Sequence, residues 1–190
     1  MEKNYIESKT FEKINFNETE LTKGEYENCS FINCDFSNLI FSNINFTECE
    51  FNDCNLSLAK FSNTAFRDIK FKNCKLLGLQ FSNCNPFLLA FEFDNCILTL
   101  SSFHKLNIKN TKFKNSILNE VDFSETNLNN SLFDNCDLTR TIFYRTNLEK
   151  VDFRTSYNYS IDPEYNRMKK ARFSLNGITG LLSKYDIEIE

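Results

Sequence analysis

Large hydrophobic residues recur at every fifth position through most of this 190-residue chain. Phe, Leu, Tyr or Ile holds the repeated position from Phe11 to Phe81 and again, in a shifted register, from Phe93 to Phe153. Of the 21 Phe residues, 18 lie in these two runs. A period of five matches neither a helix, at 3.6, nor a strand, at 2. The chain must turn at every repeat and send each fifth side chain to a common interior, which predicts a solenoid.

A second inward position lies two residues before each large residue and holds small or apolar side chains. All eight cysteines occupy this position: Cys29, Cys34, Cys49, Cys54, Cys74, Cys84, Cys96 and Cys136. Free Cys behaves as a compact hydrophobe. Cys29 and Cys34 do not form a C-x-x-C pair, and no histidine nearby completes a zinc set. We therefore predict buried structural thiols, with no metal and no cofactor.

The resulting small–polar–large–polar–polar pattern resembles the pentapeptide-repeat family from about residue 11 to residue 157. The resemblance implies an all-β fold, a right-handed quadrilateral parallel β-helix in which four pentapeptides form one square coil. Residues twenty apart would then stack at the ordinary strand spacing of about 4.8 Å. We expect this pentapeptide-repeat solenoid to cover 1–158, with a register break at 82–92. A short α-helical C-terminal cap and dimerisation segment would cover 159–190.

The register break contains a possible partner loop. Twelve residues separate Phe81 from Phe93, and Pro86, in the expected large position, cannot donate a backbone hydrogen bond. One interpretation is an apolar protrusion that contacts a partner. The other is a tolerated insertion that folds back over the core. The candidate loop residues are Pro86, Phe87, Leu88, Leu89 and Phe91.

The repeat is predicted to end after Phe153. Asp162 and Pro163 favour a helix start, which predicts a helix over 163–170. A second amphipathic helix and an edge strand are expected to follow. These elements would cap the open end of the solenoid. Alternatively, their apolar face forms a homodimer through the C-terminus. The candidate dimerisation residues are Leu175, Ile178, Leu181, Leu182, Tyr185, Ile187 and Ile189.

Charge and hydropathy argue against two classes of partner, nucleic acid and membrane. A net charge of −4 and a pI near 5.2 argue against direct nucleic-acid binding. No apolar run reaches the roughly 18 residues of a membrane span. The N-terminus has no basic-then-apolar signal pattern. These features predict a cytoplasmic protein with no membrane partner.

Two acidic bands, separated by a basic zone at 60–75, give a candidate acidic surface. They form either a surface that a basic groove grips or part of a solvated surface of mixed sign. The candidate residues are Glu48, Glu50, Asp53, Glu120, Asp122 and Glu125.

No set of residues predicts catalysis. His104, the single histidine, lies at an outward position, and no Ser–His–Asp set can be built around it. A phosphate-binding glycine-rich loop is also missing. A solenoid whose core is filled leaves no cavity for a substrate. We therefore predict that the chain is not an enzyme.

Several stretches resemble the AlbG, Qnr and MfpA group of pentapeptide-repeat resistance proteins. They are residues 51–58, 71–79, 157–162, 169–175 and 181–189. The resemblance implies a dimeric rod that mimics DNA and protects DNA gyrase from inhibitors. In that group's arrangement, 163–189 would form the dimer contact, and 85–92, shorter here than the group's loops, would engage gyrase. The alternative is a structural or scaffold protein that binds another protein, with no topoisomerase role.

Overall fold

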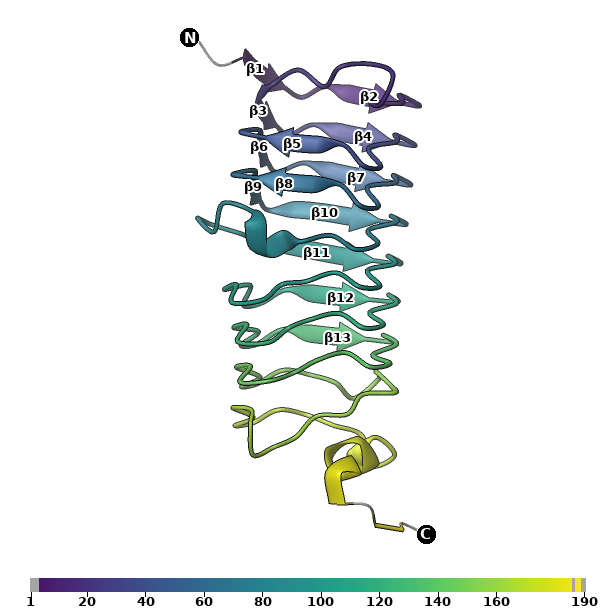
Figure 1. Cartoon of the computed structure of the whole chain (residues 1–190), viewed down its shortest axis with the longest axis vertical. Coiled ribbons are helices and arrows are strands. Elements are labelled where there is room, and N and C mark those ends of the chain that lie inside the picture. Colours follow the sequence, from purple (N-terminus) through teal and green to yellow (C-terminus); the bar gives the residue numbers. More distant parts are fainter. Residues whose placement is uncertain (1–3, 186, 189–190) are drawn as a thin grey trace.

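The computed structural model describes residues 4–185 and 187–188. The chain winds as a parallel β-solenoid into a rod, with the two termini at opposite ends (Figure 1). All paired strands are parallel, and most partners lie twenty residues apart in the sequence, as Phe11 and Phe31 do. This spacing confirms the predicted β-helix, in which four pentapeptides complete one coil.

The rod has four faces, which we number in the order the chain visits them. Face 1 holds the four-stranded sheet of β1 (Asn4–Glu7), β3 (Gly24–Glu27), β6 (Asn45–Thr47) and β9 (Ala65–Arg67). Face 2 holds the seven-stranded sheet of β2 (Thr10–Glu12), β4 (Ser30–Ile32), β7 (Glu50–Asn52), β10 (Ile69–Lys72), β11 (Phe91–Asp94), β12 (Lys112–Lys114) and β13 (Leu132–Asp134).

The other two faces contain less regular strand. Face 3 is a column of isolated bridges that includes Asp35, Asn55, Ile97 and Asp137. Face 4 holds β5 (Ile40–Ser42) and β8 (Lys60–Ser62), followed by the short 3₁₀ helix η1 (Phe81–Asn83). Because the coil is square, face 2 lies opposite face 4.

Stacked phenylalanine rings fill the core. On face 2, nine rings form one column, with neighbouring centroids 4.7–5.4 Å apart: Phe11, Phe31, Phe51, Phe71, Phe93, Phe113, Phe133, Phe153 and Phe173. Most of these rings are fully buried. Parallel strands place identical side chains above one another, and offset stacked rings attract beyond their simple burial. The column passes the register break without interruption, so the core stays continuous there.

The corners between faces require a left-handed backbone. At most corners the second residue after the large one has φ of 50–63°, and Asn is the commonest residue at these sites. Asn tolerates this conformation better than most residues because its short side chain hydrogen-bonds locally. Stacked corner amides also bond to each other, as Asn63 does to Asn43 at 3.0 Å and Asn135 to Asn115 at 3.0 Å. In the sequence these positions are recognisable only as polar.

The eight cysteines are free and buried, as predicted. Most of their thiols bond to backbone carbonyls of the same and the preceding coil, as Cys54 Sγ does to Asn52 and to Phe31, each at 3.3 Å. Ser and Thr hydroxyls do the same at equivalent positions, as Thr126 does to the Phe103 carbonyl at 2.8 Å. Burial raises the pKa of Cys49 and of Cys136 to about 12, so these thiols stay protonated at neutral pH.

The C-terminal end corrects the expected helix over 163–170 and the expected end of the solenoid. The predicted helix over 163–170 is wrong, because this segment forms a further coil. Bridges join Asn147 to Arg167 and Asp152 to Arg172, and the Phe173 ring stacks on Phe153. The predicted start signal acts locally instead, since Asp162 accepts a hydrogen bond from the backbone N–H of Glu164. Pairing with the preceding coil gives hydrogen-bond partners to backbone N–H and C=O groups that would have none at the ends of a lone helix. The solenoid geometry thus continues past 158, where we expected it to end.

The helical cap consists of two short 3₁₀ turns, η2 (Ile178–Leu181) and η3 (Ser183–Tyr185), in place of the expected second α-helix. Gly180 packs so closely on the Tyr159 backbone that an added Cβ would collide with the Tyr159 carbonyl. Lys184 pairs with Asp162 and Glu164, each at 2.8 Å, and ties the cap to the last coil. No strand forms at Ile187, and Ile189 lies outside the described residues.

Candidate functional interface

The segment between η1 and β11 projects from the side of the rod (Figure 1). Asn85 still pairs with Ala65, and Phe91 pairs with Ile69, so two extra residues are accommodated between them. Phe87 and Leu88 form the exposed tip, each with 64% of its surface accessible. Leu89 and Phe91 are buried, and the Phe91 ring lies 5.3 Å from Phe81. The segment therefore folds back over the core with Leu89 and Phe91 and projects with Phe87 and Leu88, and contact of this tip with a partner stays a prediction.

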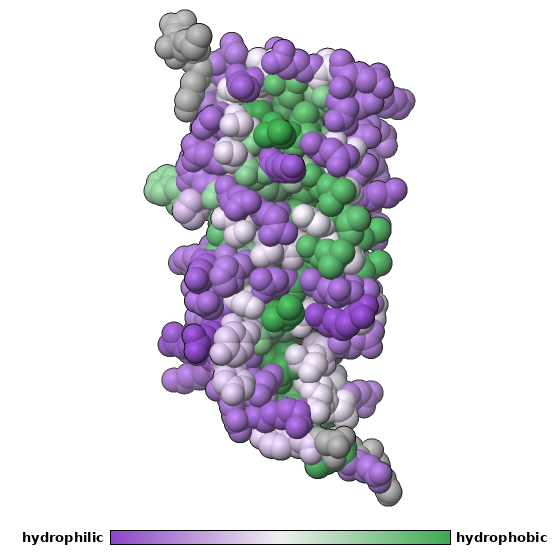
Figure 2. Space-filling model, viewed as in Figure 1, coloured by the Kyte–Doolittle hydropathy of each residue, from purple (hydrophilic) through white to green (hydrophobic). Residues whose placement is uncertain are grey.

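The tip belongs to face 1. The guanidinium of Arg67, at the end of β9, lies 5.8 Å from the centre of the Phe87 ring. The backbone N–H of Ala90 donates to the Phe66 carbonyl on the same face. Pro86 is exposed beside the tip. Figure 2 shows that apolar groups reach the surface around the middle of an otherwise largely polar rod.

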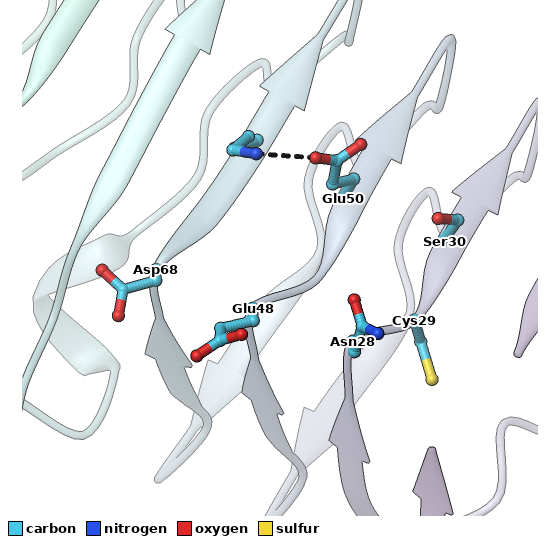
Figure 3. Close-up of a pocket in the computed structure, with 7 residues that line it drawn as sticks. Asn28, Cys29, Ser30, Glu48, Glu50 and Asp68 are labelled. Atoms are coloured by element: carbon cyan, nitrogen blue, oxygen red, sulfur yellow. Dashed lines mark hydrogen bonds and ion pairs between the residues drawn. The ribbon is translucent and has the colours of Figure 1, made fainter. Parts of the chain in front are cut away.

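The first acidic band lies around the corner between faces 1 and 2. Glu48 follows β6, and Asp68 follows β9 one coil later, with both carboxylates at the surface (Figure 3). Glu25 and Glu27 of β3 lie on face 1 nearby. Asp68 was not among the predicted acidic residues. The twenty-residue stacking rule would have identified Asp68, because it lies directly after Glu48 in the same column.

A shallow groove of about 460 Å³, open to solvent, runs along this corner (Figure 3). Its lining residues are Asn28, Cys29, Ser30, Glu48, Glu50, Asp68 and Lys70. Glu50 is paired with Lys70 at 2.8 Å, whereas Glu48 and Asp68 make no ion pair within residues 4–185 and 187–188. The groove thus presents uncompensated carboxylates on the side of the rod that carries the Phe87–Leu88 tip.

The second acidic band lies around face 4, further along the rod. Asp122 belongs to face 4, where it bridges Ser102 and Ile142, and Glu120 and Glu125 occupy the corners beside it. Glu120 pairs with Arg140 at 2.7 Å, and Glu125 contacts Lys105 at 3.9 Å. In the first band, Asp53 accepts a hydrogen bond from Asn73 at the far corner of face 2. The structure therefore does not bring the six predicted acids together on one face.

The predicted dimerisation residues behave differently from one another. Leu181 packs against the core and Leu182 is half-buried. Leu175 is 87% exposed, and Ile178, Tyr185 and Ile187 are also exposed. The cap therefore closes the solenoid with Leu181 and leaves a group of apolar side chains in solvent at the end of the rod.

The single histidine and the potential metal ligands do not form a site in the described part of the chain. His104 lies at an outward position on face 4 and is half-buried, with its ring Nδ1 3.0 Å from the Ser124 carbonyl oxygen. Within the described part of the chain, no cluster of His, Cys, Asp and Glu is placed to hold a metal ion. Nor does any described helix have the length and apolar character to cross a membrane.

Comparison with solved structures identifies similar rods. QnrB1, a plasmid-mediated fluoroquinolone resistance protein, matches in a trypsin-treated variant form with a TM-score of 0.76 and 16% identity, over 98% of this chain and 92% of that one. Full-length QnrB1 matches with a TM-score of 0.64 and 16% identity, over 97% of this chain and 100% of that one. At this identity the likeness shows a shared fold. No curated protein matches the chain by sequence.

The sequence itself matches a model of the pentapeptide repeat region over residues 24–92 and 88–158, which together span well over half of the chain. The stacked core, the left-handed corners and the twenty-residue strand register give that match a physical basis. The chain belongs to the pentapeptide-repeat family.

Proposed function

We propose that this protein binds a type II topoisomerase such as DNA gyrase and protects it from inhibitors. The observation that carries the proposal is a composite surface on face 1. This surface consists of the acidic groove around Glu48 and Asp68 and the apolar Phe87–Leu88 tip. The rod shares its fold with QnrB1, a fluoroquinolone resistance protein.

The chemistry of the two parts suits a protein that normally holds DNA. A DNA-binding groove is basic, so uncompensated carboxylates on a narrow rod would be attracted to it. The long-range attraction speeds association, and the tip adds apolar contact area that a DNA duplex lacks. The acidic groove would therefore orient the rod, and Phe87 and Leu88 would anchor it.

We also propose that two rods associate through their C-terminal ends. The exposed side chains of Leu175, Ile178 and Tyr185 favour this arrangement, because association would remove them from water. A two-fold dimer of this kind would extend the rod and present a composite surface on each half.

Gyrase supercoiling assays with and without a fluoroquinolone test the proposal. The wild-type protein should restore supercoiling in the presence of the drug. Glu48→Lys with Asp68→Lys should raise the concentration needed for protection by about tenfold or more, because the charges that steer binding are reversed. Glu120→Lys with Glu125→Lys makes the same charge change at the two corners of face 4, outside the acidic groove, and should leave protection unchanged.

A loop variant separates the apolar contact from the charge. Phe87→Ser with Leu88→Ser should weaken protection while leaving the melting temperature unchanged, because both side chains are exposed. Failure of the wild-type protein to bind gyrase or restore supercoiling at low salt would refute the proposal and leave the scaffold alternative. Equal losses from the two charge variants would refute the assignment of the acidic groove.

A further inference from the structure

The two ends of the rod carry opposite charge, which the overall net charge of −4 conceals. Residues 1–57 contain eleven acids and four bases, whereas residues 140–172 contain eight bases and four acids. Stacking of the coils brings the Lys and Arg residues of the last coils close together, because positions twenty apart share a column. The C-terminal end therefore has a basic surface, although the chain as a whole is acidic.

Five cations gather on the last coils of face 1 and its two corners. Arg145 occupies one corner, and Lys150 and Lys170 are consecutive members of the column at the other. Arg167 and Lys169 lie between the corners: Arg167 bridges Asn147, and the Lys169 carbonyl accepts from the Lys150 backbone N–H. We call these five residues the basic end. Glu149 is the acid among them and contacts Arg167 at 3.7 Å.

Elsewhere on the rod, many charged side chains have a partner in the next coil. Lys70 pairs with Glu50, and Arg140 pairs with Glu120. At the basic end, Lys150, Lys169 and Lys170 make no ion pair within the described residues. Like charges stacked directly opposite each other repel. A bound anion with regularly spaced charges would relieve this repulsion, which Glu149 offsets only at Arg167.

Two exposed aromatic rings lie beside Arg145, at the other corner of face 1 from Lys150 and Lys170. Tyr144 and Tyr165, on successive coils, are 41% and 56% exposed, and their ring centres are 5.5 Å apart. The Arg145 guanidinium lies 5.2 Å from the centre of the Tyr144 ring. Exposed rings would add little to the binding of a carboxylate-rich protein partner. Unstacked nucleic-acid bases pack on such rings while their phosphates contact nearby cations.

We propose that the basic end binds single-stranded nucleic acid, with phosphates on Lys150, Lys169 and Lys170 and bases on Tyr144 and Tyr165. This proposal goes beyond the proposed function and rests on different residues. If both hold, the rod would contact an enzyme through the acidic groove and nucleic acid through the basic end. The net-charge argument against nucleic-acid binding would then fail, because it averages over two ends of opposite sign.

Fluorescence anisotropy with a labelled oligodeoxythymidylate of about 12 nucleotides tests this inference. The wild-type protein should bind at about 50 mM salt and lose affinity at about 200 mM, because phosphate contacts release counterions. Lys150→Glu with Lys170→Glu should weaken binding at least tenfold. Lys60→Glu with Lys72→Glu makes the same charge change elsewhere on the rod and should leave binding unchanged.

The tyrosines give a second readout. Tyr144→Ala with Tyr165→Ala should weaken binding of the single strand by about tenfold and have little effect on a duplex of equal length, because paired bases cannot stack on the rings. Thermal melting of each variant verifies folding, and Lys150→Gln with Lys170→Gln gives a milder charge change.

Three outcomes would overturn the proposal: no binding by the wild-type protein at low salt, equal losses from the control lysines, or tighter binding of a polyglutamate peptide than of the oligonucleotide. Glu48→Lys with Asp68→Lys should leave oligonucleotide binding intact. Failure of this proposal is therefore distinguishable from failure of the proposed function.

Discussion

At the scale of single residues, the corners decide which side chains the fold tolerates. Most corners hold a residue with positive φ, a conformation that β-branched side chains adopt only with strain. Asn tolerates positive φ and adds hydrogen bonds between coils, as where the Asn95 amide donates to Asn73 at 2.8 Å. Residues that look in the sequence like ordinary solvent-facing polar side chains therefore stabilise the turn itself.

Asn115 provides a test of this role. Its side chain donates to Asp94 at 3.1 Å and accepts from Asn135 at 3.0 Å, and its φ is 50°. Asn115→Val should lower the free energy of unfolding by about 1–3 kcal/mol, because Val strains the backbone and removes both bonds. Asn115→Gly, which tolerates the conformation, should cost less in urea denaturation. Equal losses from Val and Gly would contradict the role of positive φ.

The buried thiols predict how stability depends on pH. The pKa of Cys49, ordinarily 9.0, is raised to about 12 in the folded protein by burial. The unfolded thiol ionises first as pH rises, so its contribution is fully present below about pH 9 and is lost between about pH 9 and about pH 12. The free energy of unfolding should therefore fall over this alkaline range. Cys49→Ala should reduce the slope, and an unchanged slope in that variant would exclude this thiol as a cause.

At the scale of elements, the register break shows how a solenoid absorbs an insertion. The Phe71 and Phe93 rings stack at 5.4 Å across a 22-residue step, so the two extra residues leave the face 2 column intact. The chain accommodates them on face 1, where the tip projects from the surface, while Leu89 and Phe91 stay buried. Strand pairing on face 2 resists any shift, because a slip would move every large side chain out of its column.

Shortening this segment should therefore be tolerated. Deleting Pro86 and Phe87 places Leu88 at the large inward position and Ala90 at the corner, where Ala90→Asn would suit positive φ. We expect this variant to keep its melting temperature within a few degrees of the wild type, because it restores the twenty-residue period, and to lose topoisomerase protection. A large drop in melting temperature would show that the insertion stabilises the coil.

At the scale of the whole molecule, the cap leaves apolar side chains exposed at the end of the rod. Sedimentation velocity at micromolar concentration should show a dimer. Leu175→Asp with Ile178→Asp should dissociate it without unfolding the rod, because neither side chain is buried. Leu58→Asp, at an exposed corner of the rod's side, is a matched control and should remain dimeric. A monomeric wild-type protein would refute the dimer.

The sequence by itself determined the coil, because a five-residue period with one large and one small inward position has a single way to bury Phe and Cys. It also determined the location of the insertion, since Pro86 breaks that period. Only the tertiary structure decided which residues share a surface. The twenty-residue stack separates Glu48 from Glu120 and brings Glu48 beside Asp68 on the side that carries Phe87.

The C-terminal segment shows the same division. Asp162 and Pro163 are a valid local signal for a helix start, but the open end of the solenoid offers the backbone of 165–172 a ready set of partners. Pairing with that edge prevails over the local preference, because it satisfies backbone groups and buries Phe173 in the same step. Local sequence therefore decides the turns and the core of this protein, whereas the stacking of coils decides its surface.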